Sequence, residues 1–196
     1  MTARDRTVDR RPFVAELVAA CPSALVIAGL GAPAYDLFAA GDRDESFYLW
    51  GAMGGAAAMG LGLALAQPNR SVIVLTGDGE QLMGLGALAT IGAQRPGNLT
   101  VVVLDNGHYG ETGMQESHTS LGTSLAAVAL ACGFDRAWEI ASADGVQPLA
   151  ERVRARDGCA LAQVLVRAEA LGRTLPSRDG VHLKNRLRAA LGFAGA

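Results

Sequence analysis

The sequence predicts an α/β domain in which a doubly wound, mostly parallel sheet of about six strands carries helices on both faces. Short apolar runs alternate with segments of helix length, which is typical of a parallel sheet that is buried on both sides. The chain has 196 residues, of which 50% are hydrophobic, so it is long enough to bury a full core. Aromatic residues make up only 5% of the chain, whereas 25 residues are glycine. Such small side chains let helices lie close to a sheet.

Five apolar runs are expected to form buried strands. In chain order they are Ala24–Ala28, Phe47–Trp50, Ser71–Leu75, Leu99–Leu104 and Ala160–Val166. A less apolar run, Arg136–Ile140, is the candidate for a sixth strand.

Six segments of helix length are interspersed with these strands. Pro12 and Pro33 stand where the first turn of a helix tolerates a residue without an N–H group, and Pro68 and Pro96 end helices before two of the strands. The expected helices are Pro12–Ala20, Pro33–Ala40, Gly54–Ala66, Gln81–Ala93, Thr123–Cys132 and Gly145–Arg156.

We expect one domain over residues 1–196, with a core at about 12–167, because no repeat or linker divides the chain. Residues 168–196 read as a polar tail that ends in a short basic helix, Val181–Leu191, which is expected to be solvated.

The net charge of −2 gives no electrostatic reason to expect nucleic acid or a membrane surface as a partner. The first 13 residues are charged and lack the apolar stretch of a signal peptide, and the most apolar run, Met53–Ala66, is short and interrupted by glycines. Cys21, Cys132 and Cys159 are far apart and are expected to be reduced core thiols. We therefore expect a soluble, cytoplasmic protein.

Ligands of an open α/β sheet bind beyond the carboxyl ends of its strands. The turn Thr76-Gly77-Asp78-Gly79 directly follows a strand, and its glycines allow the backbone to approach an anion. A carboxylate there would repel phosphate unless a cation lay between them, and Mg²⁺ favours carboxylate and phosphate oxygens. We expect Asp78 to lie on a loop outside the core.

A second turn, Asp105-Asn106-Gly107-His108, follows the next strand, and Asn106 can offer an amide oxygen to the same ion. Twenty-six residues separate Gly79 from Asn106, which leaves room for one helix and one strand.

This spacing resembles the signature of thiamine diphosphate enzymes. The resemblance implies that Mg²⁺ is held by Asp78, by Asn106 and by the backbone carbonyl of His108. The family usually has Asn before the liganding Asn, where this chain has Asp105.

A third turn, Trp50-Gly51-Ala52-Met53-Gly54, places Met53 25 residues before Asp78. The resemblance implies that Met53 is the apolar wedge that bends the cofactor into a V, and that the carbonyl of Gly51 accepts a hydrogen bond from the aminopyrimidine. The alternative is that Met53 belongs to the core.

The stretch from about Phe47 to Pro176 resembles the cofactor-binding half of sulfopyruvate and phosphonopyruvate decarboxylases. This likeness implies a lyase that forms an aldehyde and CO₂ from a 2-oxo acid through ylid and enamine intermediates. It also implies a second, pyrimidine-domain subunit that supplies the activating Glu, in a hetero-oligomer such as α₂β₂.

A fourth turn, Gly29–Ala34, matches GxGxxA, which is a dinucleotide fingerprint when its context is right. We interpret Gly29 and Gly31 as a further diphosphate-side loop. The chain has Ala32-Pro33-Ala34-Tyr35 where its relatives are expected to carry hydroxyl groups and an Arg, which puts sulfonate or phosphonate specificity in question.

The polar loop Gly107–Ser120 follows a predicted metal ligand. Backbone N–H groups of Tyr109, Gly110 and Glu111 are expected to wrap the diphosphate. His108, Glu111 and His118 are candidates for proton transfer or for recognition of the substrate carboxylate, or else solvated loop residues. Glu80 is expected to cap the helix that follows the glycine turn.

Three other functions remain open from the sequence. One is a carboligase subunit similar to acetolactate synthase, which would form a 2-hydroxyketone. Another is a nicotinamide dinucleotide domain that uses Gly29–Ala34. The last is a cofactor-binding interaction subunit without activity of its own.

Overall fold

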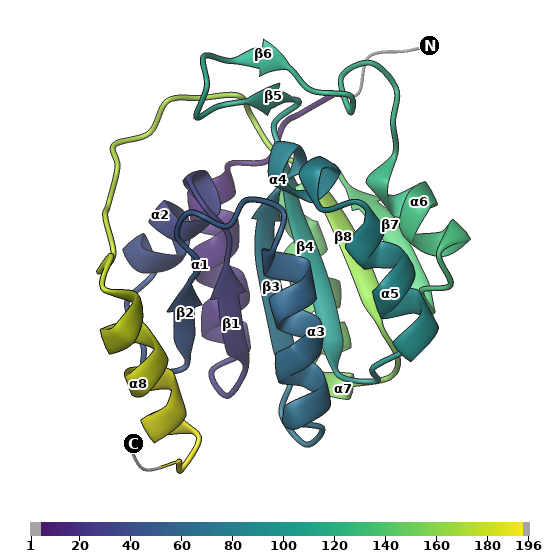
Figure 1. Cartoon of the computed structure of the whole chain (residues 1–196). Coiled ribbons are helices and arrows are strands. Elements are labelled where there is room, and N and C mark those ends of the chain that lie inside the picture. Colours follow the sequence, from purple (N-terminus) through teal and green to yellow (C-terminus); the bar gives the residue numbers. More distant parts are fainter. Residues whose placement is uncertain (1–4, 194–196) are drawn as a thin grey trace.

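In the computed structural model, which describes residues 5–193, six parallel strands form one sheet between two layers of helices (Figure 1). Residues 1–4 of the charged N-terminal stretch lie outside the described residues. Across the sheet the strands are β2 (Ser46–Tyr48), β1 (Leu25–Ala28), β3 (Val72–Gly77), β4 (Leu99–Asp105), β8 (Ala160–Leu165) and β7 (Arg136–Ile140). The predicted fold class and all six predicted strands are confirmed.

The register of the central strands fixes where the chain leaves the sheet. Gly77 at the end of β3 pairs with Leu104 near the end of β4, so Asp78 and Asp105 follow at the same level. Alternate residues of each strand enter the two halves of the core, as the pleat of a sheet requires. The buried strand residues are apolar on both faces, which explains why they read as continuous runs.

Each face of the sheet is covered by three helices. One layer holds α1 (Arg10–Ala20), α2 (Ala32–Ala39) and α7 (Val146–Ala155), the last preceded by a single 3₁₀ turn, η1 (Ala143–Gly145). The other layer holds α3 (Ala56–Ala66), α5 (Gly86–Gln94) and α6 (Leu125–Ala131). None of the described helices is long and apolar enough to cross a bilayer.

The helix predicted over Gln81–Ala93 is divided into two. A short helix, α4 (Asp78–Met83), begins directly at the end of β3, and α5 starts again at Gly86. A methyl group on Gly84 would overlap the backbone of Gly54, so the two chain segments pack backbone to backbone at the break. Periodicity could not reveal this break, because apolar residues continue across it from Leu82 to Leu88.

The polar loop after β4 contains a small antiparallel hairpin, β5 (His108–Tyr109) and β6 (Gln115–Glu116), in which His108 pairs with Glu116. Figure 1 shows the hairpin standing above the carboxyl ends of the sheet strands. It thereby forms a roof over the edge at which a ligand of this fold would bind.

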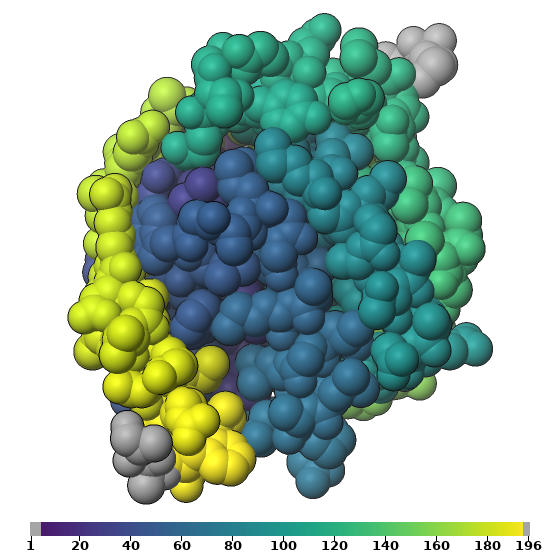
Figure 2. Space-filling view, in the orientation of Figure 1, coloured from purple at the N-terminus to yellow at the C-terminus, as the bar shows by residue number. Residues whose placement is uncertain are grey.

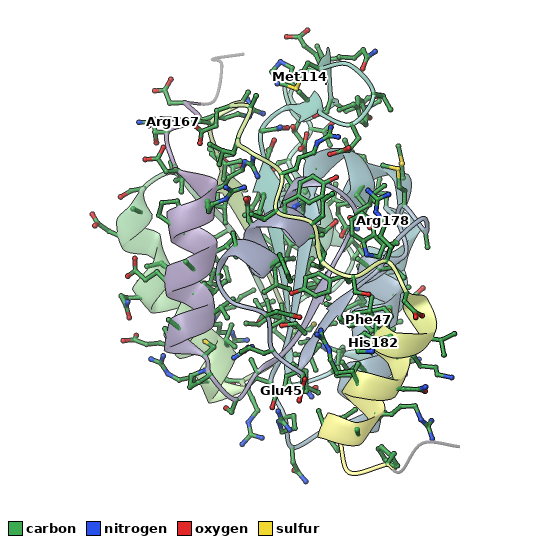
Figure 3. The ribbon with its side chains drawn as sticks, turned by 90° about the vertical axis from the view of Figure 1, so that its left-hand side faces the viewer. Glu45, Phe47, Met114, Arg167, Arg178 and His182 are labelled. Carbon is green, nitrogen blue, oxygen red and sulfur yellow. The ribbon has the colours of Figure 1, made fainter. Side chains whose placement is uncertain are left out.

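The C-terminal helix α8 (Gly180–Ala190) is not the solvated tail that its composition predicts. Leu183 and Leu187 are buried, and Arg186 is ion-paired with Asp42 and donates a hydrogen bond to the carbonyl of Ser46. Figure 3, which labels Phe47 of β2 and His182 of α8, shows the helix lying along the β2 edge of the sheet. The helix therefore covers an edge strand that would otherwise be open.

We expect Leu183→Ala to lower the free energy of unfolding by about 2–4 kcal/mol, because it removes a fully buried side chain from this edge. Urea denaturation followed by circular dichroism measures the change. Val181→Ala is the matched control on the same helix, since Val181 is 65% exposed and should change stability by less than about 0.5 kcal/mol. Equal effects of the two substitutions would contradict the packing of α8.

Candidate functional site

A cavity opens at the carboxyl ends of the central strands, beneath the β5–β6 hairpin. Residues that the sequence singled out as ligand-binding supply much of its lining: Met53, Gly77, Asp78, Gly79, Glu80, Asn106, His108, Tyr109, Gly110 and Glu111. Ala32 and Pro33 also line it, together with Arg10, Leu30, Met83, Leu104, Thr112 and Val166. Gly29, Gly31, Gly51 and His118 lie outside the lining, in loops that contribute neighbouring residues to it.

Asp78 is buried, which corrects the expectation that it lies on a loop outside the core. It is the first residue of α4 and is 2% exposed. Its carboxylate accepts hydrogen bonds from the hydroxyl groups of Ser117 and, at 3.3 Å, Thr119. Burial, followed by the nearby charge of Asp105, raises the pKa of Asp78 to about 6. A buried carboxylate with a like charge beside it is a favourable place for a cation.

Asp105, the residue that departs from the usual Asn, is fully buried at the end of β4. Its Oδ1 accepts hydrogen bonds from the backbone N–H of Gly107 at 2.9 Å and the hydroxyl of Thr119 at 2.7 Å, and its Oδ2 accepts one from the amide of Gln163 at 2.6 Å. Arg6 adds an ion pair at 3.2 Å. The carboxylate is therefore a structural group, and its negative charge is paired with Arg6 of the N-terminal segment.

Asn106 follows at the same edge and is partly exposed to the cavity. Its Oδ1 accepts a hydrogen bond from the backbone N–H of His108 at 2.9 Å, which leaves a second lone pair for a cation. The imidazole Nδ1 of His108 lies 2.8 Å from the carbonyl oxygen of Asn106. These two local contacts fix the turn that follows β4.

Met53 is not a core residue. It is 40% exposed and lines the cavity from the turn between β2 and α3. Gly51 and Gly54 in the same turn have φ angles of 73° and 87°, values that suit glycine. The turn thus presents an apolar side chain to the cavity.

The β5–β6 hairpin brings some of the predicted loop residues together and separates others. The Tyr109 hydroxyl lies 3.2 Å from Nδ1 of His118, so His118 braces the hairpin and does not reach the cavity. The Tyr109 ring packs so closely on Gly79 that a methyl group there would overlap it. Glu111 lies against Gly31, the residue before α2, and lines the cavity. The Gly29–Ala34 loop therefore opens onto the same cavity as Asp78.

Glu80 lies in the first turn of α4, at the positive end of the helix dipole, as the sequence predicts. Its carboxylate is 4% exposed, accepts a hydrogen bond from the hydroxyl of Thr76 at 2.9 Å and lies against Gly29. Burial raises the pKa of Glu80 to about 7, and the Thr76 hydroxyl opposes this shift.

The segment between β8 and α8 runs along one side of the molecule as the yellow-green band in Figure 2. Arg173 lies over the ring of Tyr35 and 3.7 Å from Glu111, and Arg178, labelled in Figure 3, lies over the ring of Trp50. The two aromatic rings are 6.4 Å apart. Two guanidinium groups thus flank an aromatic pair next to the turn that carries Met53.

Sequence reasoning missed the residues that support the two carboxylates. Ser117 and Thr119 alternate in a polar loop, and Arg6 and Gln163 are 99 and 58 residues away from Asp105 along the chain. Arg10 was also missed; it is buried against Asp36 and lines the cavity. The one available signal was Gln163, a polar residue in the middle of an otherwise apolar strand, which has to find a buried partner.

A family model described as thiamine pyrophosphate enzyme, C-terminal TPP binding domain, matches residues 37–175. The phosphonopyruvate decarboxylase of Streptomyces viridochromogenes is 41% identical over 167 residues, which cover 85% of this chain and 42% of that protein. The sulfopyruvate decarboxylase subunit beta of Methanocaldococcus jannaschii is 44% identical over 111 residues, which cover 57% of this chain and 58% of that subunit. The chain thus spans less than two thirds of the length of either relative.

Solved structures share the fold at low sequence identity. The 4-hydroxybenzoylformate decarboxylase of Rhodococcus jostii superposes with a TM-score of 0.69 at 20% identity, over 86% of this chain and 34% of that one. The benzoylformate decarboxylase of Polynucleobacter necessarius gives a TM-score of 0.67 at 20% identity, over 89% and 36% of the two chains.

The raised pKa of Asp78 predicts how the stability of the metal-free protein depends on pH. Below about pH 4 the carboxyl is protonated in both the folded and the unfolded state; as the pH rises through about 6, the folded state has to ionise a buried acid, and stability is lost. Relative to wild type, Asp78→Asn should therefore gain roughly 1–3 kcal/mol of stability between pH 4 and pH 8. Urea titrations at a series of pH values measure this difference, and a difference that does not change with pH would contradict the burial of a charged Asp78.

Proposed function

The chain belongs to the thiamine pyrophosphate enzymes, through their C-terminal TPP-binding domain, and on this premise we propose that it is the cofactor-binding subunit of a two-subunit 2-oxo acid decarboxylase. The observation that carries the proposal is the meeting of Asp78, Asn106 and Met53 in one cavity. These residues come from three turns that are distant in the sequence. Asp78 and Asn106 offer oxygen atoms to a metal ion, and Met53 offers an apolar side chain to the cofactor.

Asp78 and Asn106 are proposed to hold Mg²⁺, together with the backbone carbonyl of His108. Mg²⁺ prefers oxygen ligands and is usually bound by one or two carboxylates plus phosphate oxygens. The donor set fits this ion, because Asp78 offers a buried carboxylate. The nearby charge of Asp105 disfavours the ionised form of this carboxylate, and a bound cation would stabilise it. No group of three or more His, Cys, Asp or Glu side chains suited to a metal occurs among the described residues, which agrees with a site that relies on cofactor oxygens.

The diphosphate is proposed to lie between the start of α4 and the turn Tyr109–Glu111. The first N–H groups of a helix have no partner within it, so α4 offers donors at Asp78, Gly79 and Glu80. Glycines allow the loops around this space to pack closely on one another. Gly79 faces the ring of Tyr109 and Gly31 faces Glu111, in each case without room for a methyl group. Arg10, at 7% exposure, adds a positive charge to the lining.

Bound thiamine diphosphate supplies the electron sink that decarboxylation of a 2-oxo acid requires. Met53 is proposed to be the apolar residue that contacts the bound cofactor. The carbonyl of Gly51 would accept a hydrogen bond from the aminopyrimidine of the cofactor. His108 and Glu111, which line the cavity, are the candidates to move a proton or to orient the substrate carboxylate. His118 is better placed to brace Tyr109.

A second chain is proposed to complete the site by supplying the Glu that activates the pyrimidine. Relatives named as subunit beta match this chain, and the phosphonopyruvate decarboxylases it matches are more than twice as long as the matched part. The rim of the site suits a protein partner, because Met83 and Met114 are about half exposed there. The layer of α3, α5 and α6 carries no charged side chain at all. The assembly proposed is a hetero-oligomer such as α₂β₂.

The substrate is proposed to be a 2-oxo acid with a second anionic group. Tyr35 belongs to the stretch in which hydroxyl groups and an Arg were expected, and the guanidinium of Arg173 lies 5.9 Å from the centre of its ring. A positive charge is thus present in the region, although it comes from a different segment of the chain.

Cofactor binding should depend on Mg²⁺ and on Asp78. We expect Asp78→Asn to weaken Mg²⁺-dependent binding of thiamine diphosphate at least 100-fold, because the amide cannot balance the charge of the ion. Isothermal titration calorimetry of the chain co-purified with its partner subunit measures the affinity. Glu151→Gln, an exposed acid on α7, is the control and should bind like wild type. Undiminished binding by Asp78→Asn would remove the proposal.

Decarboxylation should require both chains. We expect no CO₂ from a panel of 2-oxo acids with this chain alone, and aldehyde with CO₂ once the pyrimidine-domain subunit is added. A 2-hydroxyketone as the product would instead indicate carboligation, and robust activity of this chain by itself would contradict the two-chain arrangement.

Met53 should affect turnover more than stability. We expect Met53→Ala to lower kcat of the assembled enzyme about tenfold, which corresponds to about 1.4 kcal/mol in the barrier. Thermal unfolding should change little, because Met53 is 40% exposed. Leu121→Ala is the control: its side chain is 65% exposed and does not line the cavity. Equal kcat values for the two variants would exclude the wedge.

A further inference from the structure

The segment between β8 and α8, residues 167–179, forms neither a helix nor a strand, and we call it the strap. Hydrogen bonds fasten it to the body of the domain. The Arg11 guanidinium donates one to the carbonyl of Gly172 at 2.8 Å, and the Thr174 hydroxyl donates one to the carbonyl of Tyr35 at 2.5 Å. The strap is therefore held against α1 and α2 before it reaches α8.

The strap also contacts Trp50, the residue directly before Gly51. The indole Nε1–H donates a hydrogen bond to the carbonyl of Ser177 at 2.8 Å, and the guanidinium of Arg178 lies 5.2 Å from the centre of the indole ring. At this distance a guanidinium is attracted to the face of the ring. The ring of Tyr35, on α2, has its centre 6.4 Å from that of the indole. Trp50 is thus bound by the strap and packed on α2.

The turn that follows Trp50 has few anchors in its own sequence. Residues 51–53 are exposed, and the backbone of Gly51 and Gly54 has positive φ angles. Glycines at such positions permit many backbone conformations, so neighbouring groups have to select one. The close packing of Gly54 on Gly84 fixes the far end of the turn, and Trp50 fixes the near end.

Helix α8 anchors the other end of the strap. Figure 3 shows the chain continuing past Arg178 into the first turn of α8. This helix is held by its buried Leu183 and by an ion pair of 2.6 Å between Arg186 and Asp42. Since α8 packs along β2, and β2 ends two residues before Trp50, the strap and the turn are supported by the same strand. The strap is consequently a fixed support for the indole.

We propose that the strap sets the position of the turn of residues 51–53 by holding Trp50 through the Ser177 carbonyl and the Arg178 guanidinium. Trp50 lies outside the lining of the cavity, so it acts through the turn and is a positioning residue. The inference rests on the proposed function for its effect on the cofactor, because this turn is proposed there to meet the thiamine part. Its structural part concerns the apo protein.

Trp50→Phe removes the indole donor and keeps an aromatic ring. In the assembled protein with Mg²⁺ we expect this variant to bind thiamine diphosphate about fivefold more weakly, because a hydrogen bond that orders the turn is lost and ordering is then drawn from the binding energy. Trp138→Phe is the matched control, since Trp138 is the other tryptophan of the chain, and it should bind like wild type. Isothermal titration calorimetry measures both affinities.

Inorganic diphosphate with Mg²⁺ is the second probe in the same experiment. It has no thiamine part, so it does not meet the turn, and its affinity should be the same in Trp50→Phe and wild type. A substitution that damages the domain in general would weaken the binding of both probes alike.

Arg178→Met removes the charge over the indole and leaves the Nε1–H donor in place. We expect it to weaken thiamine diphosphate binding about threefold and to leave inorganic diphosphate binding unchanged. Its control is Arg188→Met, which removes an arginine that lies 6.0 Å from the centre of the Phe193 ring, and which should bind both probes like wild type. This pair decides the matter if Trp50→Phe fails to fold.

Limited proteolysis of the apo protein reports on the turn itself. We expect proteinase K to cut within residues 50–55 at least about fivefold faster in Trp50→Phe than in wild type, because a less restrained segment opens more often. Cleavage elsewhere in the chain, identified by mass spectrometry, should proceed at the wild-type rate. Trp138→Phe should match wild type at every site.

The outcomes separate the inference from the proposed function. Wild-type affinity for thiamine diphosphate in both Trp50→Phe and Arg178→Met would overturn the positioning role. Equal losses of affinity for the two probes would also overturn it, because they would indicate general damage. If wild type binds no thiamine diphosphate, the proposed function fails, while the cleavage rates still decide whether the strap holds the turn: faster cutting supports this role, and equal rates contradict it.

Discussion

The burial of two carboxylates at the ends of adjacent central strands is the constraint on which the rest of the site depends. Asp78 and Asp105 leave β3 and β4 at the same level and are 2% and 0% exposed. Two buried like charges are unfavourable unless hydrogen bonds and opposite charges compensate them. Asp105 is paired with Arg6 and accepts hydrogen bonds from Thr119 and Gln163, whereas the side chains that donate to Asp78 in the described part of the chain are the hydroxyl groups of Ser117 and Thr119. Among the described residues no cationic side chain is paired with Asp78, which is therefore the carboxylate with capacity for a cation.

The need to provide hydrogen-bond donors to Asp78 and Asp105 explains the shape of the loop after β4. Ser117 and Thr119 have to return to the strand ends to reach the carboxylates, so the residues between them and Asn106 must turn back on themselves, and the β5–β6 hairpin results. Arg6 arrives from the N-terminal segment and passes against Gly107, where a side chain would collide with it. The roof over the cavity is thus a consequence of satisfying polar groups beneath it.

The turns around the cavity are joined by close backbone contacts in which glycine takes part. Gly29 and Gly79 each face a bulky group, the Glu80 carboxylate and the Tyr109 ring, and Gly54 faces Gly84 across two chain segments. Glycines let four loops come within van der Waals contact, but they provide no side chains to hold the loops there. Buried polar groups therefore link these loops: the Glu80 carboxylate accepts a hydrogen bond from Thr76 at the end of β3 and lies against Gly29 after β1, and Asp105 holds the turn after β4. The apolar, charge-free layer of α3, α5 and α6 stabilises the sheet below without fixing the loops above.

The sequence by itself determined the sheet, the order of its helices and the residues that meet at its carboxyl edge. Apolar runs such as Leu99–Leu104 can be buried on both faces only in a parallel sheet, and the turn residues Asp78 and Asn106 must then lie at one edge. Only the tertiary structure decided the rest. It buried Asp78, divided the helix at Gly84, packed α8 onto β2, placed the Glu80 carboxylate against Gly29, and placed Arg6 and Gln163 on Asp105. These outcomes depend on which distant groups share one small volume, and local periodicity carries no information about that, because hydrogen-bond partners such as Arg6 and Asp105 are 99 residues apart along the chain.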